Sequence, residues 1–144
     1  TLLSYAPSED EAGSFADIPD SHIDFLENNL VSYYECESHF FVHANVDAKI
    51  ALNEQSDASL YWKKYDNPER HCSEKIMVCG HTAQQTGLPL SNDHSICIDT
   101  WAYGGGWLSC FDVESGMVWQ ANEAGDTRSF ATDQNLTART DQQS

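Results

Sequence analysis

Two histidines stand at the ends of apolar runs, where a fold can place side chains for chemistry. His43 ends the run FFVH and His81 follows the run IMVCG, and small residues come directly after each. Ligands of open α/β sheets bind at the carboxyl ends of the strands, and imidazole is a common ligand of divalent transition metals. The shared pattern predicts that His43 and His81 bind metal, whereas a single histidine after a strand is more often a structural residue.

The elements that must position these histidines follow from hydrophobic patterning. Apolar runs rich in β-branched and aromatic residues predict strands at 38–44, 75–79, 95–99, 107–113 and 117–121. The connection at 114–116 contains glycine and indicates a hairpin. Helical spacing predicts a helix from a cap at Ser21 to Tyr33, and a short helix at 59–64. This mixture predicts an α/β (α+β) fold, with 123–144 as a polar tail of low order.

Charge and composition limit the classes of partner. The 144 residues carry 7 Lys plus Arg against 23 Asp plus Glu, a formal net charge of -16. A nucleic-acid groove or an anionic membrane surface requires clustered basic residues, so neither partner is expected. The sequence contains neither an apolar run long enough for a membrane span nor the pattern of a signal peptide. Five cysteines without a C-x-x-C pair predict buried, reduced thiols and a cytoplasmic protein.

Three segments resemble the calcineurin-like metallophosphoesterases. They are HFFVHANVDAKIALNEQ, EKIMVCGHTAQQTGLP and SICIDTWAYGGGWLSCFDVESGMVWQA, in the order in which that family has them. The resemblance is greatest to the bacterial serine/threonine protein phosphatases of the phosphoprotein phosphatase type and to the symmetrical dinucleoside tetraphosphatases. It covers about residues 1–122 and implies the C-terminal half of a β-sandwich flanked by helices.

The resemblance also implies the chemistry. The complete domain of the family holds two divalent metal ions, Mn, Fe or Zn, which clamp the phosphoryl oxygens and activate water for in-line attack. His43 in V-H-A and His81 in G-H-T match the two histidine ligands of the second metal, and Thr82 follows as a supporting hydroxyl. Asn45 replaces a glycine of many relatives, which indicates a subgroup difference. The implied substrate is a phosphorylated protein or a nucleotide.

Phosphoryl transfer also needs a cation beside the nonbridging oxygens. Relatives supply an arginine from the segment before the G-H-T strand, and here that segment offers Lys63, Lys64 and Arg70. The resemblance further places Tyr103 near the phosphate, in a turn whose glycines let the backbone approach the substrate. In the same turn Trp101 replaces a glycine, and it either narrows the mouth of the site, stacks on a base or forms an aromatic lid on the core.

Three family motifs do not occur in the sequence: G-D-x-H-G, G-D-x-x-D-R-G and G-N-H-E, which carry the remaining metal ligands. We therefore expect at most one partial metal site in this chain, and no phosphatase activity unless an N-terminal half is supplied. A second hypothesis is a catalytically silent module for binding or scaffolding. A third is an acidic all-β module whose aromatic residues form a ligand platform: Trp101, Tyr103, Trp107 and Trp119. The pattern does not separate protein phosphatase from dinucleoside tetraphosphate hydrolase, and it does not predict the oligomeric state.

Overall fold

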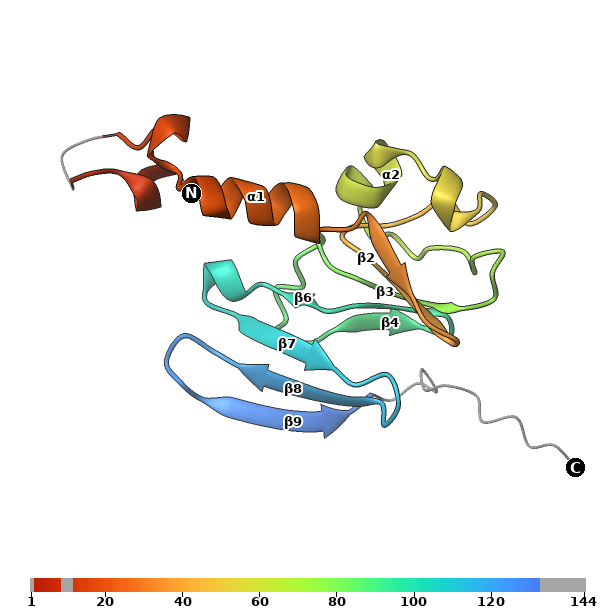
Figure 1. Cartoon of the computed structure of the whole chain (residues 1–144). Coiled ribbons are helices and arrows are strands. Elements are labelled where there is room, and N and C mark those ends of the chain that lie inside the picture. Colours follow the sequence, from red (N-terminus) through yellow and green to blue (C-terminus); the bar gives the residue numbers. More distant parts are fainter. Residues whose placement is uncertain (1, 9–11, 133–144) are drawn as a thin grey trace, which may run out of the picture. The chain divides into compact units, whose positions relative to one another are not determined.

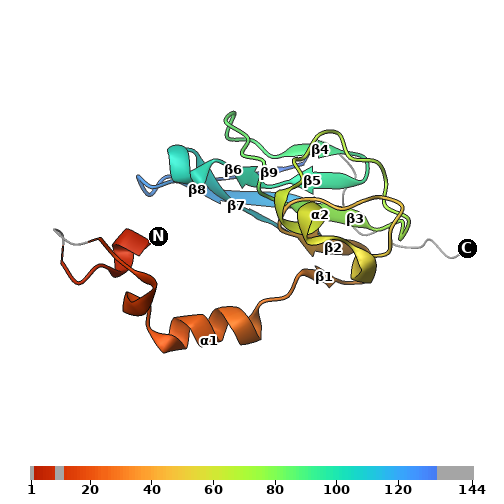
Figure 2. The ribbon, with the colours of Figure 1, turned by 90° about the horizontal axis from the view of Figure 1, so that it is seen from above.

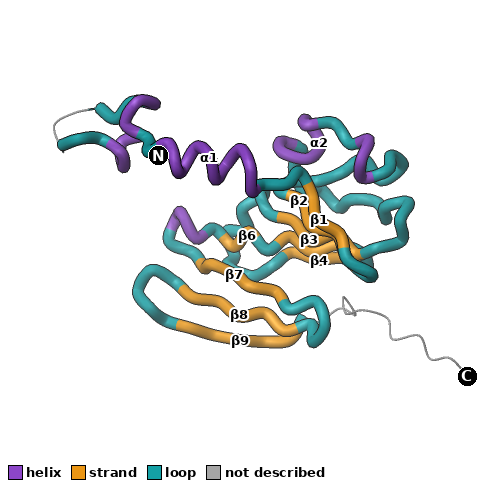
Figure 3. Tube along the Cα trace, in the orientation of Figure 1, coloured by secondary structure: helices purple, strands orange, loops and turns teal. Residues whose placement is uncertain are grey.

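The computed structural model describes residues 2–8 and 12–132. The chain divides into two compact units, Thr1–Val31 and Ser32–Ser144. Its helices and strands are labelled in Figure 1, and Figure 3 separates them from the loops. Single-turn 3₁₀ helices lie at Leu2–Tyr5, Phe15–Asp17, Leu52–Glu54 and Ala102–Gly104. Helices together with one mixed and one antiparallel sheet give the protein an α+β fold.

The first unit contains helix α1 (Asp20–Asn29), which begins one residue before the predicted cap. The carbonyl of Pro19 accepts the first backbone hydrogen bonds of the helix, so the prediction of Ser21 as the cap is wrong. The chain becomes extended at Leu30, directly after α1. Tyr33 therefore lies outside the helix and begins a strand of the second unit.

The second unit contains a mixed five-stranded sheet in the order β1-β2-β3-β5-β4. Its central strands β2, β3 and β5 are parallel, and the two edge strands run antiparallel to their neighbours. The three central strands confirm the predictions at 38–44, 75–79 and 95–99, whereas the two edge strands are not predicted. The strands are β1 (Tyr33–Glu35), β2 (His39–Val42), β3 (Ile76–Cys79), β4 (Leu90–Asn92) and β5 (Ser95–Cys97).

An antiparallel four-stranded sheet follows, in the order β6-β7-β8-β9, and Figure 1 shows its last three strands side by side. The predicted hairpin is confirmed by the pairing of β7 with β8. The prediction of low order from residue 123 is wrong for β9, and residues 133–144 lie outside the described part of the chain. The strands are β6 (Asp99–Thr100), β7 (Trp107–Phe111), β8 (Met117–Ala121) and β9 (Thr127–Ala131).

Strand β9 pairs with β8 along its length, and Arg128 adds side-chain contacts to this pairing. Arg128 donates from Nε to Oε1 of Gln120 at 2.6 Å and from Nη2 to the carbonyl of Gly87 at 2.7 Å. Its guanidinium also lies 4.1 Å from the ring centroid of Trp107, within the range of a cation–π contact. Polar contacts therefore hold a strand whose sequence, TRSFA, has little hydrophobic pattern.

The second unit has three layers, because side chains alternate between the two faces of the mixed sheet. One face packs on the antiparallel sheet through an apolar cluster that includes Ile76, Ile96 and Phe111. The other face packs on helix α2 (Asp57–Trp62), with Phe40 and Leu60 in its cluster. Figure 2 shows α2 over β2 and β3 in the view from above. No helix among the described residues is long and apolar enough to cross a membrane.

Candidate functional site

The two predicted histidines lie together at the carboxyl ends of neighbouring parallel strands. His43 directly follows β2 and His81 lies two residues after β3. The Nε2 atom of His43 is 3.2 Å from Nδ1 of His81, and the ring centroids are 5.0 Å apart. Without a metal, one of these two nitrogens is protonated and donates a hydrogen bond to the other. Two ring nitrogens at one solvent-accessible point are a potential ligand pair.

The backbone at His81 adopts a left-handed conformation, with φ of 62°. This region is uncommon for residues other than glycine, although histidine enters it more readily than β-branched residues do. The turn that follows is fixed because the Thr82 N–H donates to the carbonyl of Gly80 at 2.7 Å. His81 therefore has both a strained backbone and a candidate ligand side chain. Backbone strain of this kind often accompanies functional sites.

The ligand pair fits one divalent metal ion. Metal–imidazole bonds are about 2.0–2.1 Å long, so two nitrogens 3.2 Å apart subtend an angle of about 100° at a shared ion. That angle is compatible with tetrahedral and with octahedral coordination. Over residues 2–8 and 12–132 no group of three or more His, Cys, Asp and Glu side chains is arranged to hold a metal. The described residues therefore offer two ligands toward one ion.

Two polar side chains, one buried and one partly exposed, hydrogen-bond the loops behind the histidines. Asn45 is 1% exposed, and its Nδ2 donates to the carbonyl of Lys64 at 2.8 Å while its Oδ1 accepts from the N–H of Val46. Thr82 accepts from the N–H of Tyr65 through Oγ1 at 2.8 Å. The segment after α2 is thereby held against both histidine loops. Asn45, which replaces a glycine of the resembled family, has a structural role here.

The two predicted lysines have different surroundings. Lys64 Nζ donates to the carbonyl of His81 at 3.3 Å, which places a positive charge beside the histidine pair. Lys63 Nζ donates to the carbonyl of Val46 at 2.9 Å and supports the loop after His43. Both lysines therefore reach the loops that carry the histidines, but only Lys64 bonds to one of the two ligand residues.

The structure does not bring Arg70 to the histidine pair. Its guanidinium donates to the carbonyls of Glu74 and Asp93, at 3.4 and 3.5 Å. Those residues precede β3 and β5, so Arg70 lies at the amino ends of the strands whose carboxyl ends carry the site. Figure 3 shows that the loop between α2 and β3 turns back along the sheet. A linear sequence motif does not reveal the path of such a loop.

Two glycines of the glycine-rich turn are in close contact with the turn itself. Trp101 has φ of 65°, and a Cβ at Gly104 would overlap its indole ring. A Cβ at Gly106 would overlap the carbonyl of Thr100. These glycines make room for the Trp101 side chain and for the turn itself. Tyr103, predicted to lie near phosphate, is 82% exposed in the 3₁₀ helix of this turn.

Trp62 is a site residue that the sequence reasoning did not single out. It is the last residue of α2, it is 73% exposed, and its ring stands perpendicular to that of His81 at a centroid distance of 6.2 Å. Its position directly before the paired lysines was the available signal.

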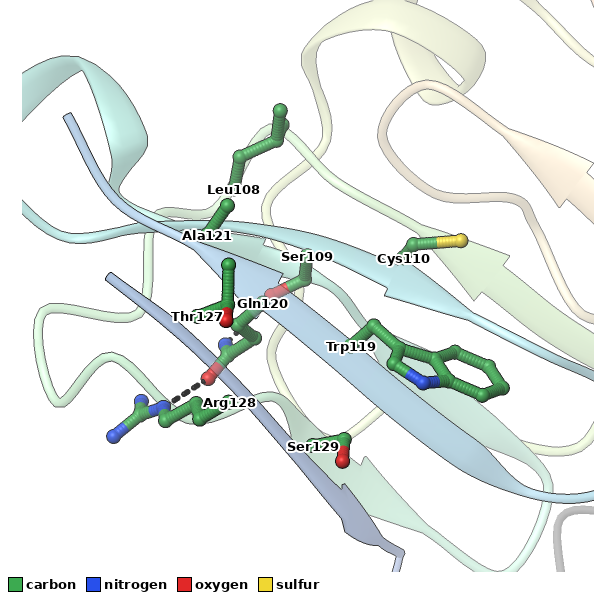
Figure 4. Close-up of a pocket in the computed structure, with 9 residues that line it drawn as sticks. All are labelled: Leu108, Ser109, Cys110, Trp119, Gln120, Ala121, Thr127, Arg128 and Ser129. Atoms are coloured by element: carbon green, nitrogen blue, oxygen red, sulfur yellow. Dashed lines mark hydrogen bonds between the residues drawn. The ribbon is translucent and has the colours of Figure 1, made fainter. Parts of the chain in front are cut away.

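A pocket with a volume of about 610 Å³ lies on the strands β7, β8 and β9 (Figure 4). Neither His43 nor His81 lines it. Trp119, Leu108 and Cys110 lie on one face of this sheet, whereas Trp107 contacts Arg128 on the other. The tryptophans of the proposed aromatic platform therefore do not share one surface.

No protein-family model matches the chain, and no curated protein is significantly similar to it.

Two buried cysteines with free thiols lie side by side on β3 and β5, near the strand ends that precede the site. Cys79 and Cys97 are opposite each other in the parallel register. The Cys79 thiol donates to the sulfur of Cys97, which lowers the pKa of Cys97 to about 7. The same bond, together with burial, raises the pKa of Cys79. Of the other three cysteines, Cys72 and Cys110 are exposed, so the prediction that all are buried is wrong.

We predict from this pair that the protein becomes more stable as the pH rises from about 7 to about 8.5. Over that range Cys97 is ionised in the folded state, while the unfolded chain still binds its proton, because a free thiol has a pKa of about 8.5. This contribution is lost as the pH falls through 7. Above about pH 8.5 stability falls again, because the raised pKa of Cys79, and at higher pH that of Tyr65, about 12, keeps these groups protonated only when folded.

Urea denaturation at pH 6 to 10 measures this dependence. In Cys97→Ala the rise between about pH 7 and 8.5 should disappear, whatever the loss of overall stability from the cavity. Cys110→Ala, which removes an exposed thiol, should keep it. A rise that persists in Cys97→Ala would assign the effect to other groups.

Proposed function

We propose that this chain supplies the His43 and His81 half of a two-metal phosphoesterase centre, for hydrolysis of phosphomonoesters as in the serine/threonine protein phosphatases. The observation that carries the proposal is the 3.2 Å separation of the two ring nitrogens at adjacent strand ends. When bound, the metal supplies Lewis acidity toward phosphoryl oxygens. The described residues supply this pair of ligands toward one ion, and the remaining ligands of a two-metal centre are not among the groups that they form.

The residues of the chain have distinct roles in this proposal. His43 and His81 hold the ion, and the ammonium of Lys64, bonded to the His81 carbonyl, offsets negative charge on the phosphate. Asn45 and Thr82 fix the segment that carries Lys64. A mixed sheet packed on an antiparallel sheet, with a helix on its other face, is consistent with one part of a metallophosphoesterase sandwich. Five unpaired cysteines suit the reducing cytoplasm.

Calorimetric titration of inorganic phosphate into the chain tests the proposal. A net charge of -16 repels phosphate, so binding is expected with Mn²⁺ present and not without it. The chain alone should not hydrolyse p-nitrophenyl phosphate, because two ligands do not make a two-metal centre. Turnover that His81→Ala abolishes would contradict the assignment of half a centre.

A catalytically silent binding module is the second candidate, and the ligand count of the described residues favours it: two imidazoles and no third ligand. The phosphate titration separates the candidates. Mn²⁺ binding at His43 and His81 without any gain in phosphate affinity would favour the silent module and reject the phosphoesterase.

A further inference from the structure

The exposed ring of Trp62 is the least expected feature beside the histidine pair. Tryptophan usually buries most of its surface, yet this side chain is 73% exposed. Its ring meets the edge of the His81 ring at 90° and 6.2 Å, so it borders the point where the two imidazole nitrogens converge. An accessible aromatic face beside a phosphate-binding candidate is a surface on which a flat ring stacks.

The position of Trp62 is fixed by its own helix. The N–H groups of Ala44 and Asn45, directly after His43, donate to the carbonyls of Leu60 and Ser59 in α2, at 2.9 and 3.2 Å. On the other side of the helix end, the Asn45 amide holds the carbonyl of Lys64. The backbone on both sides of Trp62 is thus bonded to the loop that begins at His43. The backbone that carries the ring therefore loses little conformational freedom when a ligand binds.

Charge decides which ligands suit this surface. The chain has a net charge of -16, and Lys64 is the cation bonded to the ligand residue His81. A polyanionic nucleic acid requires many basic residues, whereas one phosphate group requires a metal and one cation. Stacking adds affinity for the rest of the ligand without adding charge. The combination fits a small ligand with one phosphate end and one aromatic end.

We propose that Trp62 is the stacking platform for the nucleobase of a nucleoside monophosphate whose phosphate is held at His43 and His81. The proposal rests on the proposed function and narrows its substrate class from phosphoproteins to nucleotides. Trp101 does not serve this purpose, because its ring packs over Gly104 within its own turn.

The test compares three ligands by calorimetry with the full chain and Mn²⁺: inorganic phosphate, ribose 5-phosphate and AMP. Stacking of a base on an aromatic side chain is worth about 5- to 150-fold in affinity. AMP should therefore bind more tightly than ribose 5-phosphate by a factor in this range. Trp62→Ala should remove that difference, and Trp62→Phe should keep part of it. Trp119→Ala, which removes an exposed tryptophan on β8, should leave the difference unchanged.

The remaining outcomes distinguish a failure of the stacking platform from a failure of the phosphoesterase proposal. If phosphate binds with Mn²⁺ but AMP shows no advantage, or keeps its advantage in Trp62→Ala, the platform is rejected and the phosphoesterase stands. If a phosphoserine peptide binds as tightly as AMP in wild type and in Trp62→Ala, the site selects phosphoproteins and the platform is rejected. If AMP binds through Trp62 equally well without Mn²⁺, and phosphate does not bind, the phosphoesterase is rejected and the platform stands.

Discussion

If His43 and His81 share one ion as proposed, replacing His81 with alanine should lower the affinity of the chain for Zn²⁺ by about 10- to 100-fold or more, and replacing His43 should have an equal effect. Removal of a group that only orients a metal ligand already costs this much, and here one of two imidazole ligands is lost. Zn²⁺ is the sharper probe, because imidazole sites bind it more tightly than Mn²⁺. Calorimetry at pH 7.5 measures the change.

The matched control is His22→Ala, which removes an exposed histidine of the first unit that bonds to the Tyr5 hydroxyl. It should leave Zn²⁺ affinity within a factor of two. If His43→Ala and His81→Ala each reduce binding but the double variant reduces it no further, the two residues bind one ion together. Unchanged affinity in both single variants would place the metal elsewhere and remove the basis of the proposed function.

Replacing Phe40 with alanine destabilises the fold by about 3–5 kcal/mol, the usual cost of emptying a buried phenylalanine site. Phe40 is 0% exposed at the centre of β2, in the cluster between the mixed sheet and α2. Its ring also lies 5.1 Å from that of His71, so the substitution loses an aromatic contact as well. Urea denaturation followed by circular dichroism measures the shift.

Phe25→Ala is the same substitution at a position 56% exposed in α1, where a change within about 0.5 kcal/mol is expected. Equal effects of the two variants would contradict the assignment of Phe40 to the core. Because β2 leads directly into His43, Phe40→Ala should also weaken Zn²⁺ binding, and only to the extent that it populates the unfolded chain.

The central strands could be predicted because they are buried on both faces. In β2 and β3 every residue except Phe41 is buried, so the apolar run itself is the signal. Edge strands give no such signal. Strand β4 has the sequence LSN and is held by its pairing with β5. Strand β9 is held by its pairing with β8 and by the bond from Arg128 to Gly87, which is far from it in sequence.

The same distinction applies to the site. The local pattern marked His43 and His81 individually, and the family resemblance assigned them to one ion. The parallel pairing of their strands brings the two side chains together. The sequence did not choose among Lys63, Lys64 and Arg70. The structure places Arg70 at the opposite strand ends, where it bonds to the carbonyls of Glu74 and Asp93. Trp62 was not singled out because its link to the histidine pair is a ring contact with His81, which is distant from it in the sequence.

The left-handed backbone of His81 has a consequence for sequence variation. At φ of 62°, valine, isoleucine or threonine would strain the chain, while glycine, asparagine and aspartate would not. A lineage that lost the ligand while keeping the fold would therefore drift to one of these three residues. Among natural variants, a β-branched residue at position 81 would indicate that the turn has been rebuilt, and asparagine would indicate that only the chemistry has been lost.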